Sequence, residues 1–172
     1  NRRRSALLFL SRREFVNDRL WKAIDGGALI VGYNLAFDLT RLAINVGAAR
    51  HPTFLGGFSL GVFEWENQGR WQENKHRPRI RMKCLDSKRT LMGLGRRKGA
   101  RPEEQRQSLE ALGRFLDLKH LAFALTDRHH SLASAATAFG LGVGKAEVEE
   151  HGVITEPYID YNRRDVEVTA SL

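Results

Sequence analysis

The sequence has little cysteine and no long apolar run, and each absence excludes a class of structure. Its single cysteine, Cys84, cannot form a disulfide within the chain, so a reducing cytoplasmic setting is expected. No apolar stretch approaches the roughly 20 residues that a membrane-spanning helix needs. The run over residues 5–10 is too short for the core of a signal peptide. A membrane is therefore not among the expected partners.

The sequence also lacks internal repeats and any stretch that marks a linker between domains. With 172 residues and 42% hydrophobic content, the chain is long enough to form one domain with its own core. We therefore predict a single domain over residues 1–172. The first residue is Asn1 rather than Met, so we expect the chain to be processed or to be a piece of a longer one.

Positive charge is in excess, with 28 Lys and Arg against 20 Asp and Glu and a net charge of +8. This balance favours a polyanionic partner, and nucleic acid first. A solvated surface with a chance excess of arginine is the alternative. Clustering argues against that alternative: the basic clusters are residues 2–4, 12–13, 77–83, 88–89, 96–98 and 163–164.

Residues 28–42 carry the clearest structural pattern of the chain. The apolar run at residues 28–31 predicts a strand buried on both faces, and Gly32 ends it. Asn34 is a favourable N-cap, because its side-chain oxygen can accept a hydrogen bond from a free backbone N–H. The helix behind it is predicted to reach about Ala49. Its expected apolar face comprises Leu35, Leu39, Leu42, Ala43 and Val46.

Two acidic residues on separate predicted helices are candidates for a metal site. Asp38 lies in the first turn of the helix just described, at a junction where α/β proteins bind ligands; a charge that caps the helix is the alternative. Tyr161 and Asp165 are four residues apart and share a face of the last predicted helix; a Tyr–Asp surface hydrogen bond is the alternative. Carboxylates brought together repel unless cations lie between them, and Mg²⁺ or Mn²⁺ prefer oxygen ligands. Two divalent ions, Mg²⁺ or Mn²⁺, can therefore hold Asp38 and Asp165 together if the fold brings these residues close.

The middle of the chain predicts an antiparallel hairpin and two loops. Residues 58–63 and 79–85 alternate between apolar and polar, residues 64–78 are polar and loop-like, and residues 93–107 predict a mobile basic loop. The apolar side of the second strand is expected to comprise Ile80, Met82 and Cys84, and its basic side Arg79, Arg81 and Lys83. The basic side either follows a phosphate backbone or protects an exposed sheet edge. We expect residues 56–107 to be an insertion that holds this hairpin and the basic loop.

Helix starts follow from side chains that can cap them. The predicted N-caps are Ser11, Ser131 and Thr155. Glu14 completes a capping box with Ser11, since it lies three residues further on. Asp86 and Asp117 each follow a predicted strand. Both are expected to form turns, and a role as carboxylate ligands is the alternative.

Two of these stretches resemble motifs of the DEDD family of 3′–5′ exonucleases. Residues 31–38, Val-Gly-Tyr-Asn-Leu-Ala-Phe-Asp, resemble the second motif, whose core is Asn-x-x-Phe-Asp. Residues 161–165, Tyr-Asn-Arg-Arg-Asp, resemble the third motif in its Tyr-x-x-x-Asp form. Asp160 stands where the other form has histidine, so the likeness is to the tyrosine subclass, which includes proofreading domains of DNA polymerases. Residues 131–141 resemble the helix that precedes the third motif.

The resemblance implies an α/β, ribonuclease H-like fold of three layers with a mixed sheet. It implies metal-dependent hydrolysis of phosphodiester bonds from the 3′ end of a nucleic acid, DNA first. In that family Asp38 and Asp165 would bind the metal ions and Tyr161 would orient the attacking water. Asn34 and Phe37 would contact the terminal nucleotide, and for Asn34 the alternative is that it fixes the turn. A polymerase or another domain of a full-length protein is a further candidate partner.

One motif of the family is missing from these residues. The first motif is Asp-x-Glu on the opening strand, and the chain has this pattern only at Asp165–Glu167. Residues two apart on a helix do not share a face, so Glu167 cannot replace it. We expect the opening strands to be truncated and the metal site of residues 1–172 to be incomplete. The alternative is a nucleic-acid-binding module with a degenerate exonuclease fold and no activity.

Overall fold

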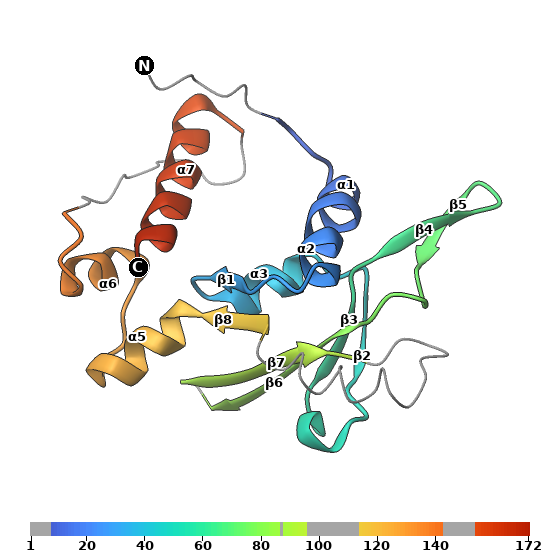
Figure 1. Cartoon of the computed structure of the whole chain (residues 1–172), viewed down its shortest axis with the longest axis horizontal. Helices are drawn as coiled ribbons and strands as arrows, with labels where there is room; N and C mark the ends of the chain where they lie inside the picture. Colours follow the sequence, from blue (N-terminus) through green and yellow to red (C-terminus); the bar gives the residue numbers. More distant parts are fainter. Residues whose placement is uncertain (1–7, 87, 96–113, 143–153) are drawn as a thin grey trace.

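A computed structural model of the chain describes residues 8–86, 88–95, 114–142 and 154–172. These residues form a mixed α/β structure with parallel and antiparallel strands (Figure 1). The helical segments are α1 (Arg12–Glu14), η1 (Phe15–Leu20), α2 (Trp21–Asp25), α3 (Leu35–Arg41), η2 (Pro52–Phe54), α5 (Leu118–Thr126), α6 (Leu132–Ala138) and α7 (Glu156–Ser171). The strands are β1 (Ile30–Gly32), β2 (Asn45–Ala48), β3 (Phe58–Gly61), β4 (Glu64–Asn67), β5 (Arg70–Glu73), β6 (Ile80–Asp86), β7 (Arg89–Leu94) and β8 (Phe115–Asp117).

The strands pair in both parallel and antiparallel arrangements, in agreement with the expected α/β class. β1 and β8 are parallel, with Ile30 opposite Phe115 and Gly32 opposite Asp117. Four strands form an antiparallel sheet in the order β2-β3-β6-β7, while β4 and β5 form a separate hairpin. The parallel pair positions the candidate site, because a helix leaves the carboxyl end of each of its strands.

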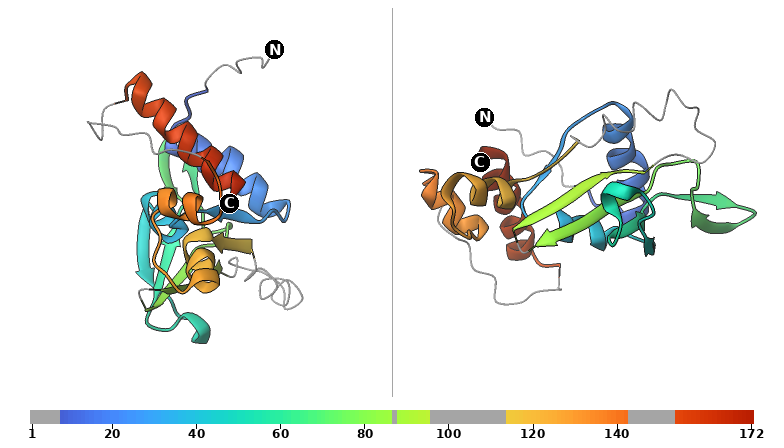
Figure 2. Two further views of the ribbon diagram at one scale, coloured as in Figure 1. Left: turned by 90° about the vertical axis from the view of Figure 1, so that its left-hand side faces the viewer. Right: turned by 90° about the horizontal axis from the view of Figure 1, so that it is seen from below.

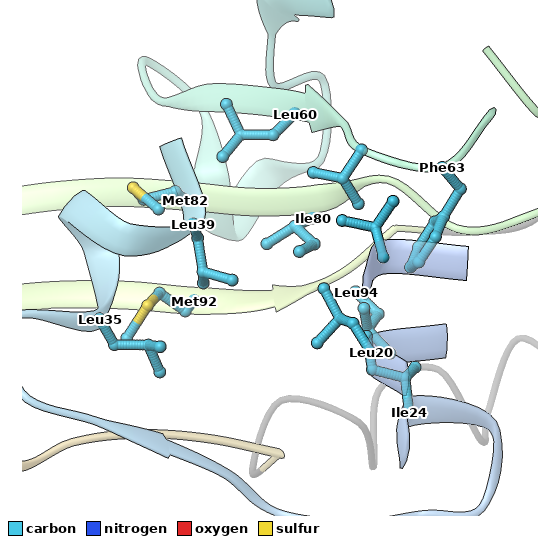
Figure 3. Packing of buried hydrophobic residues seen from close by; sticks show 12 residues of the cluster. Leu20, Ile24, Leu35, Leu39, Leu60, Phe63, Ile80, Met82, Met92 and Leu94 are labelled. Atoms are coloured by element: carbon cyan, nitrogen blue, oxygen red, sulfur yellow. The ribbon is translucent and has the colours of Figure 1, made fainter. Parts of the chain in front are cut away.

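One apolar core joins the first helix, α3 and the antiparallel sheet (Figure 3). Val16, Leu20 and Ile24 face it from the first helical segments, and Leu35 and Leu39 from α3. The antiparallel sheet contributes Leu60, Ile80, Met82, Met92 and Leu94. β3, β6 and β7, which lie within residues 56–107, are therefore part of the main core of the described structure.

The helix starts predicted at Ser11, Ser131 and Thr155 are confirmed. The Ser11 hydroxyl accepts a hydrogen bond from the Glu14 N–H at 3.2 Å, and the Glu14 carboxylate accepts one from the Ser11 N–H at 2.8 Å. The helical segments that follow run to Asp25, with a π-helical stretch at η1. Ser131 and Thr155 cap α6 and α7 as predicted.

The helix predicted to reach about Ala49 is shorter than expected. α3 ends at Arg41, and residues 45–48 form β2, where Val46 pairs with Leu60 of β3. Val46 is 57% exposed and does not belong to an apolar helix face. Helical spacing in the sequence extends past the real helix end, because pairing with a strand further along the chain decides the conformation there.

The central strand is less covered than its apolar run predicts. Val31 is 44% exposed, and Leu29 is exposed just before the strand. Within the described residues β1 pairs with β8 alone, so its second edge has no strand beside it. The prediction of burial on both faces is therefore wrong for the described structure.

The stretch predicted as a polar loop at residues 64–78 contains the hairpin of β4 and β5. Gln68 and Gly69 turn the chain with φ values of 51° and 73°. Glycine at the second position of such a two-residue turn was the signal in the sequence, since both positions need positive φ. Figure 1 shows this hairpin projecting from the rest of the molecule.

The second predicted strand keeps the expected alternation for most of its length. Ile80 and Met82 are buried in β6, whereas Cys84 is exposed, contrary to the prediction. β6 lies between β3 and β7, so its basic residues do not protect a sheet edge and that alternative is wrong. Gly93 and Leu94 belong to β7 rather than to the predicted basic loop. The rest of that loop, residues 96–107, lies outside the described residues.

None of the helices in the described ranges has the length and apolar content that crossing a bilayer requires.

Candidate functional site

The carboxyl end of the parallel pair brings two turns of the chain together. Asp117 is the last residue of β8 and the N-cap of α5, and it is only 5% exposed. Its Oδ1 accepts one hydrogen bond from the Lys119 N–H at 3.0 Å and another from the Asn34 N–H at 3.0 Å. The turn after β1 is thereby bonded to the start of α5.

Asn34 stands at the N-cap of α3, but it does not cap the helix as predicted. Its side chain makes no capping hydrogen bond, and its backbone is left-handed, with φ 67° and ψ 41°. Asparagine tolerates this conformation better than most residues. The Asn34 carbonyl accepts from the N–H groups of Phe37 and Asp38, at 2.9 and 3.4 Å. The turn is thus held through its backbone, with Asp117 as the partner of the Asn34 N–H.

Asp38 lies in the first turn of α3, near the buried Asp117. Partial burial raises the pKa of the Asp38 carboxyl, and the negative charge of Asp117 raises this pKa further. A helix N-terminus favours the ionised form of a carboxylate. The raised pKa therefore shows that desolvation and repulsion between the two carboxyl groups prevail at this position.

Phe37 and Tyr33 flank the same turn. Phe37 is 51% exposed, and the guanidinium of Arg41 lies 4.9 Å from the centre of its ring. The Tyr33 hydroxyl donates a hydrogen bond to the carbonyl of His130 at 2.9 Å. Burial raises the pKa of Tyr33, and the charge of Asp117 adds to this effect. Tyr33 thus connects the turn after β1 to the segment between α5 and α6.

Tyr161 and Asp165 share the inward face of α7, as their spacing predicts. Both are partly buried and lie on one stripe with Val168, which is buried. Burial raises the pKa of Tyr161, and the charge of Asp165 and a hydrogen bond with its carboxylate raise it further. Val166, which follows Asp165 on α7, is 68% exposed. Glu167 is exposed too, in keeping with the expectation that it cannot join the site.

The structure gives two acidic groupings. Asp38 lies with Asp117 at the parallel pair, and Asp165 lies with Tyr161 on α7, which packs against α6 (Figure 2). Asp117, and not Asp165, is the charge that shifts the pKa of Asp38. Across the described ranges, no group of three or more His, Cys, Asp or Glu side chains is arranged to hold a metal ion. Convergence of Asp38 and Asp165 on shared metal ions stays a prediction.

The two acids expected to form turns both do so, and one of them also belongs to the site. Asp86 accepts a hydrogen bond from the Lys88 N–H at 2.8 Å and pairs with Arg89 at 2.7 Å. Asp117 caps α5 and also contacts the turn that precedes Asp38. The sequence pattern missed this second contact. The only sequence feature that pointed to this contact was an acid directly after a short apolar strand. The contact itself could not be predicted, because strand order cannot be read from local spacing.

Several arginines of the basic clusters serve the fold. Arg12 donates to the carbonyls of Leu42 and Val62 and forms an ion pair with Glu64. Arg79 donates to the carbonyl of Ser59 at 2.8 Å. Net charge therefore overstates the number of cations that a polyanion could contact.

Comparisons of the chain with family models, with curated proteins and with solved structures found no match. The residues of the site and their likeness to the exonuclease motifs are therefore the basis for assigning a function.

Proposed function

We propose that this chain is a ribonuclease H-like domain of a metal-dependent 3′–5′ exonuclease that acts on nucleic acid 3′ ends, DNA first. One observation carries the proposal. Asp38 projects from the helix that leaves the carboxyl end of a parallel strand, in the Asn-x-x-Phe-Asp pattern, with its pKa raised by partial burial and by a second carboxylate. The pairing of Tyr161 with Asp165 on the inward face of α7 supports it.

The donor atoms of the site fit Mg²⁺ or Mn²⁺. Asp38 and Asp165 supply hard carboxylate oxygens, and the repulsion between Asp38 and Asp117 is of the kind that a bound cation relieves. Two such ions would stabilise the charge on the attacking and leaving oxygens of the phosphodiester. Asp38 and Asp165 would hold them, and two further carboxylates in an Asp-x-Glu pattern would complete the family's set.

The remaining residues position the substrate and water. The Tyr161 hydroxyl is protonated at neutral pH, since its pKa is raised from the ordinary value of 10.0, so it can orient a water molecule but is a poor base. The exposed ring of Phe37 offers a surface on which a base can stack. Asn34 would hold the terminal nucleotide through its side-chain amide, which makes no capping hydrogen bond in the helix.

The uncovered edge of β1 suggests where the other two carboxylates belong. Val31 and Leu29 are exposed on β1 and just before it, and among the described strands β1 pairs with β8 alone. A strand added at the other edge of β1 would pair with its backbone, shield part of these apolar side chains and lie next to the turn that carries Asp38. We propose that the Asp-x-Glu strand of the full-length protein occupies this edge.

A binding module without activity is the second candidate. The net charge of +8 fits this candidate as well as it fits the nuclease. Such a module has no need of Asp38, Tyr161 and Asp165 in their family positions. The two candidates therefore differ in whether metal-dependent cleavage depends on these side chains.

The deciding experiment measures Mg²⁺-dependent release of nucleotides from 3′-labelled single-stranded DNA by the full-length protein that contains these residues. We expect Asp165→Ala to lower the rate by about 100-fold to 1000-fold, the usual effect of losing a group that stabilises charge in the transition state. Asp160→Ala is the matched control, since Asp160 is exposed on the same helix and pairs only loosely with Arg163, at 3.5 Å. Equal activity of the wild type and Asp165→Ala would remove the exonuclease assignment.

A further inference from the structure

Asp117 is the one charged or polar residue that is buried among the described residues. Burying a carboxylate is costly unless hydrogen bonds compensate for the lost water. Within the part of the chain that the structure describes, Asp117 has such bonds on one oxygen only. Oδ1 accepts from two backbone N–H groups, whereas Oδ2 has no hydrogen-bond partner there and lies 3.5 Å from Nδ1 of His120. The compensating contacts are therefore those made to the two turns.

The two hydrogen bonds differ in what they hold. The bond from the Lys119 N–H caps α5, which is a common use of aspartate. The bond from the Asn34 N–H reaches the other strand of the parallel pair, across 83 positions of sequence. Helix capping explains the bond from the Lys119 N–H but does not explain the bond from the Asn34 N–H.

The second bond acts on the residue that sets the direction of α3. Asn34 is left-handed, and the Asp38 N–H lies 3.4 Å from the Asn34 carbonyl, so Asp38 stands one helical turn beyond it. Without an acceptor at Asp117, the Asn34 N–H would be left without a partner in a partly buried turn. The turn would then move toward a conformation in which this N–H reaches water.

We infer that Asp117 is a positioning residue that fixes the turn at Asn34 and thereby sets the orientation of the Asp38 side chain. Its effect on the turn follows from the hydrogen bonds alone, whereas its effect on catalysis rests on the proposed exonuclease function. Because only Oδ1 is used, an asparagine at position 117 keeps the necessary acceptor.

Three substitutions separate these roles in the full chain. Asp117→Asn keeps the acceptor for both turns. Asp117→Ser keeps a favourable cap for α5, but its shorter side chain does not reach Asn34. Ser11→Ala is a control for the general loss of a helix cap, because Ser11 caps α1 and not α5.

Amide hydrogen exchange tests the turn without any activity. In Asp117→Ser we expect exchange at the Asn34 amide to be about tenfold faster or more, since its hydrogen bond is lost, while the Lys119 amide stays protected. Asp117→Asn and Ser11→Ala should leave the Asn34 amide as in the wild type. Unchanged protection of the Asn34 amide in Asp117→Ser would overturn the positioning role.

Nuclease assays of the full-length protein test the catalytic consequence. We expect Asp117→Ser to lower kcat by about 10-fold to 100-fold with KM little changed, as for other residues that orient a metal ligand. Asp117→Asn should recover most of kcat. An equal kcat for Asp117→Ser and Ser11→Ala would contradict the inference, whereas a wild type without nuclease activity would contradict the proposed function and leave the exchange result to decide the turn.

Discussion

Asp38 lies where its own charge is unfavourable. Partial burial and the nearby Asp117 raise the pKa of its carboxyl, although the start of a helix favours a negative charge. A residue kept for stability alone would have no reason to carry this charge. The conflict is typical of a functional site, where stability is lost in exchange for activity.

Replacing Asp38 by asparagine should therefore stabilise the protein in EDTA at pH 7. A carboxyl whose pKa in the folded state is raised above 3.8 binds its proton more readily when folded, so its ionised form opposes folding. The destabilisation by the ionised Asp38 carboxylate is present at neutral pH and fades as pH falls through the raised pKa. Thermal unfolding from pH 7 down to pH 3 should show an advantage for Asp38→Asn that disappears at the acid end. Asp160→Asn, at an exposed site, should show no such gain; an equal gain for both variants would mean that net charge and not the site is responsible.

Strand β6 is the element on which the antiparallel sheet depends. It pairs with β3 on one side and β7 on the other, and it carries Ile80 and Met82 into the core. β2, at the edge of the same sheet, buries none of its four residues. Substitutions in the two strands should therefore have very different effects on stability.

Ile80→Ala should lower the free energy of unfolding by about 2–5 kcal/mol, because Ile80 is fully buried and its truncation leaves a cavity. Val46→Ala is the control, with the same class of side chain on an exposed position of β2. That control should cost less than about 1 kcal/mol. Urea unfolding followed by circular dichroism measures both, and a loss of similar size for the two variants would contradict the packing described for β6.

Over the whole molecule, the net charge of +8 is divided between cations that hold the fold and cations that face solvent. Arg12 is bonded to two backbone carbonyls and to Glu64, whereas Arg164 is exposed on α7, next to the position of Asp165. Only the cations that face solvent can bind nucleic acid phosphates and release the counterions around them. The two kinds should differ in how they change nucleic acid binding.

Arg164→Gln should weaken binding of single-stranded DNA and make it less dependent on salt. Losing one phosphate contact lowers the slope of log K against log[salt] by about 0.7 for a single strand. Arg12→Gln should lower the melting temperature and leave that slope unchanged, since its guanidinium serves the fold. Fluorescence anisotropy over a series of salt concentrations measures the slopes, and an unchanged slope for Arg164→Gln would show that α7 does not contact the phosphates.

Local chemistry determined much of this structure from the sequence by itself. The capping box of Ser11 and Glu14, the caps at Ser131 and Thr155, and the alternation of Ile80 and Met82 were all predicted, because each depends on residues only a few positions apart. The shared face of Tyr161 and Asp165 follows from helical spacing in the same way. The hairpin at Gln68 and Gly69 was missed, although its turn signal is local.

Tertiary structure alone decided which distant segments meet. Pairing with β3 turned residues 45–48 into a strand, and the parallel alignment of β1 with β8 brought Asp117 to the N–H of Asn34. The spacing of residues along the chain carries no information on such pairings, since strand order and register are set by how the whole core packs. For the same reason the sequence could name Asp38 as a candidate acid, while the carboxylate whose charge raises its pKa became known only from the fold.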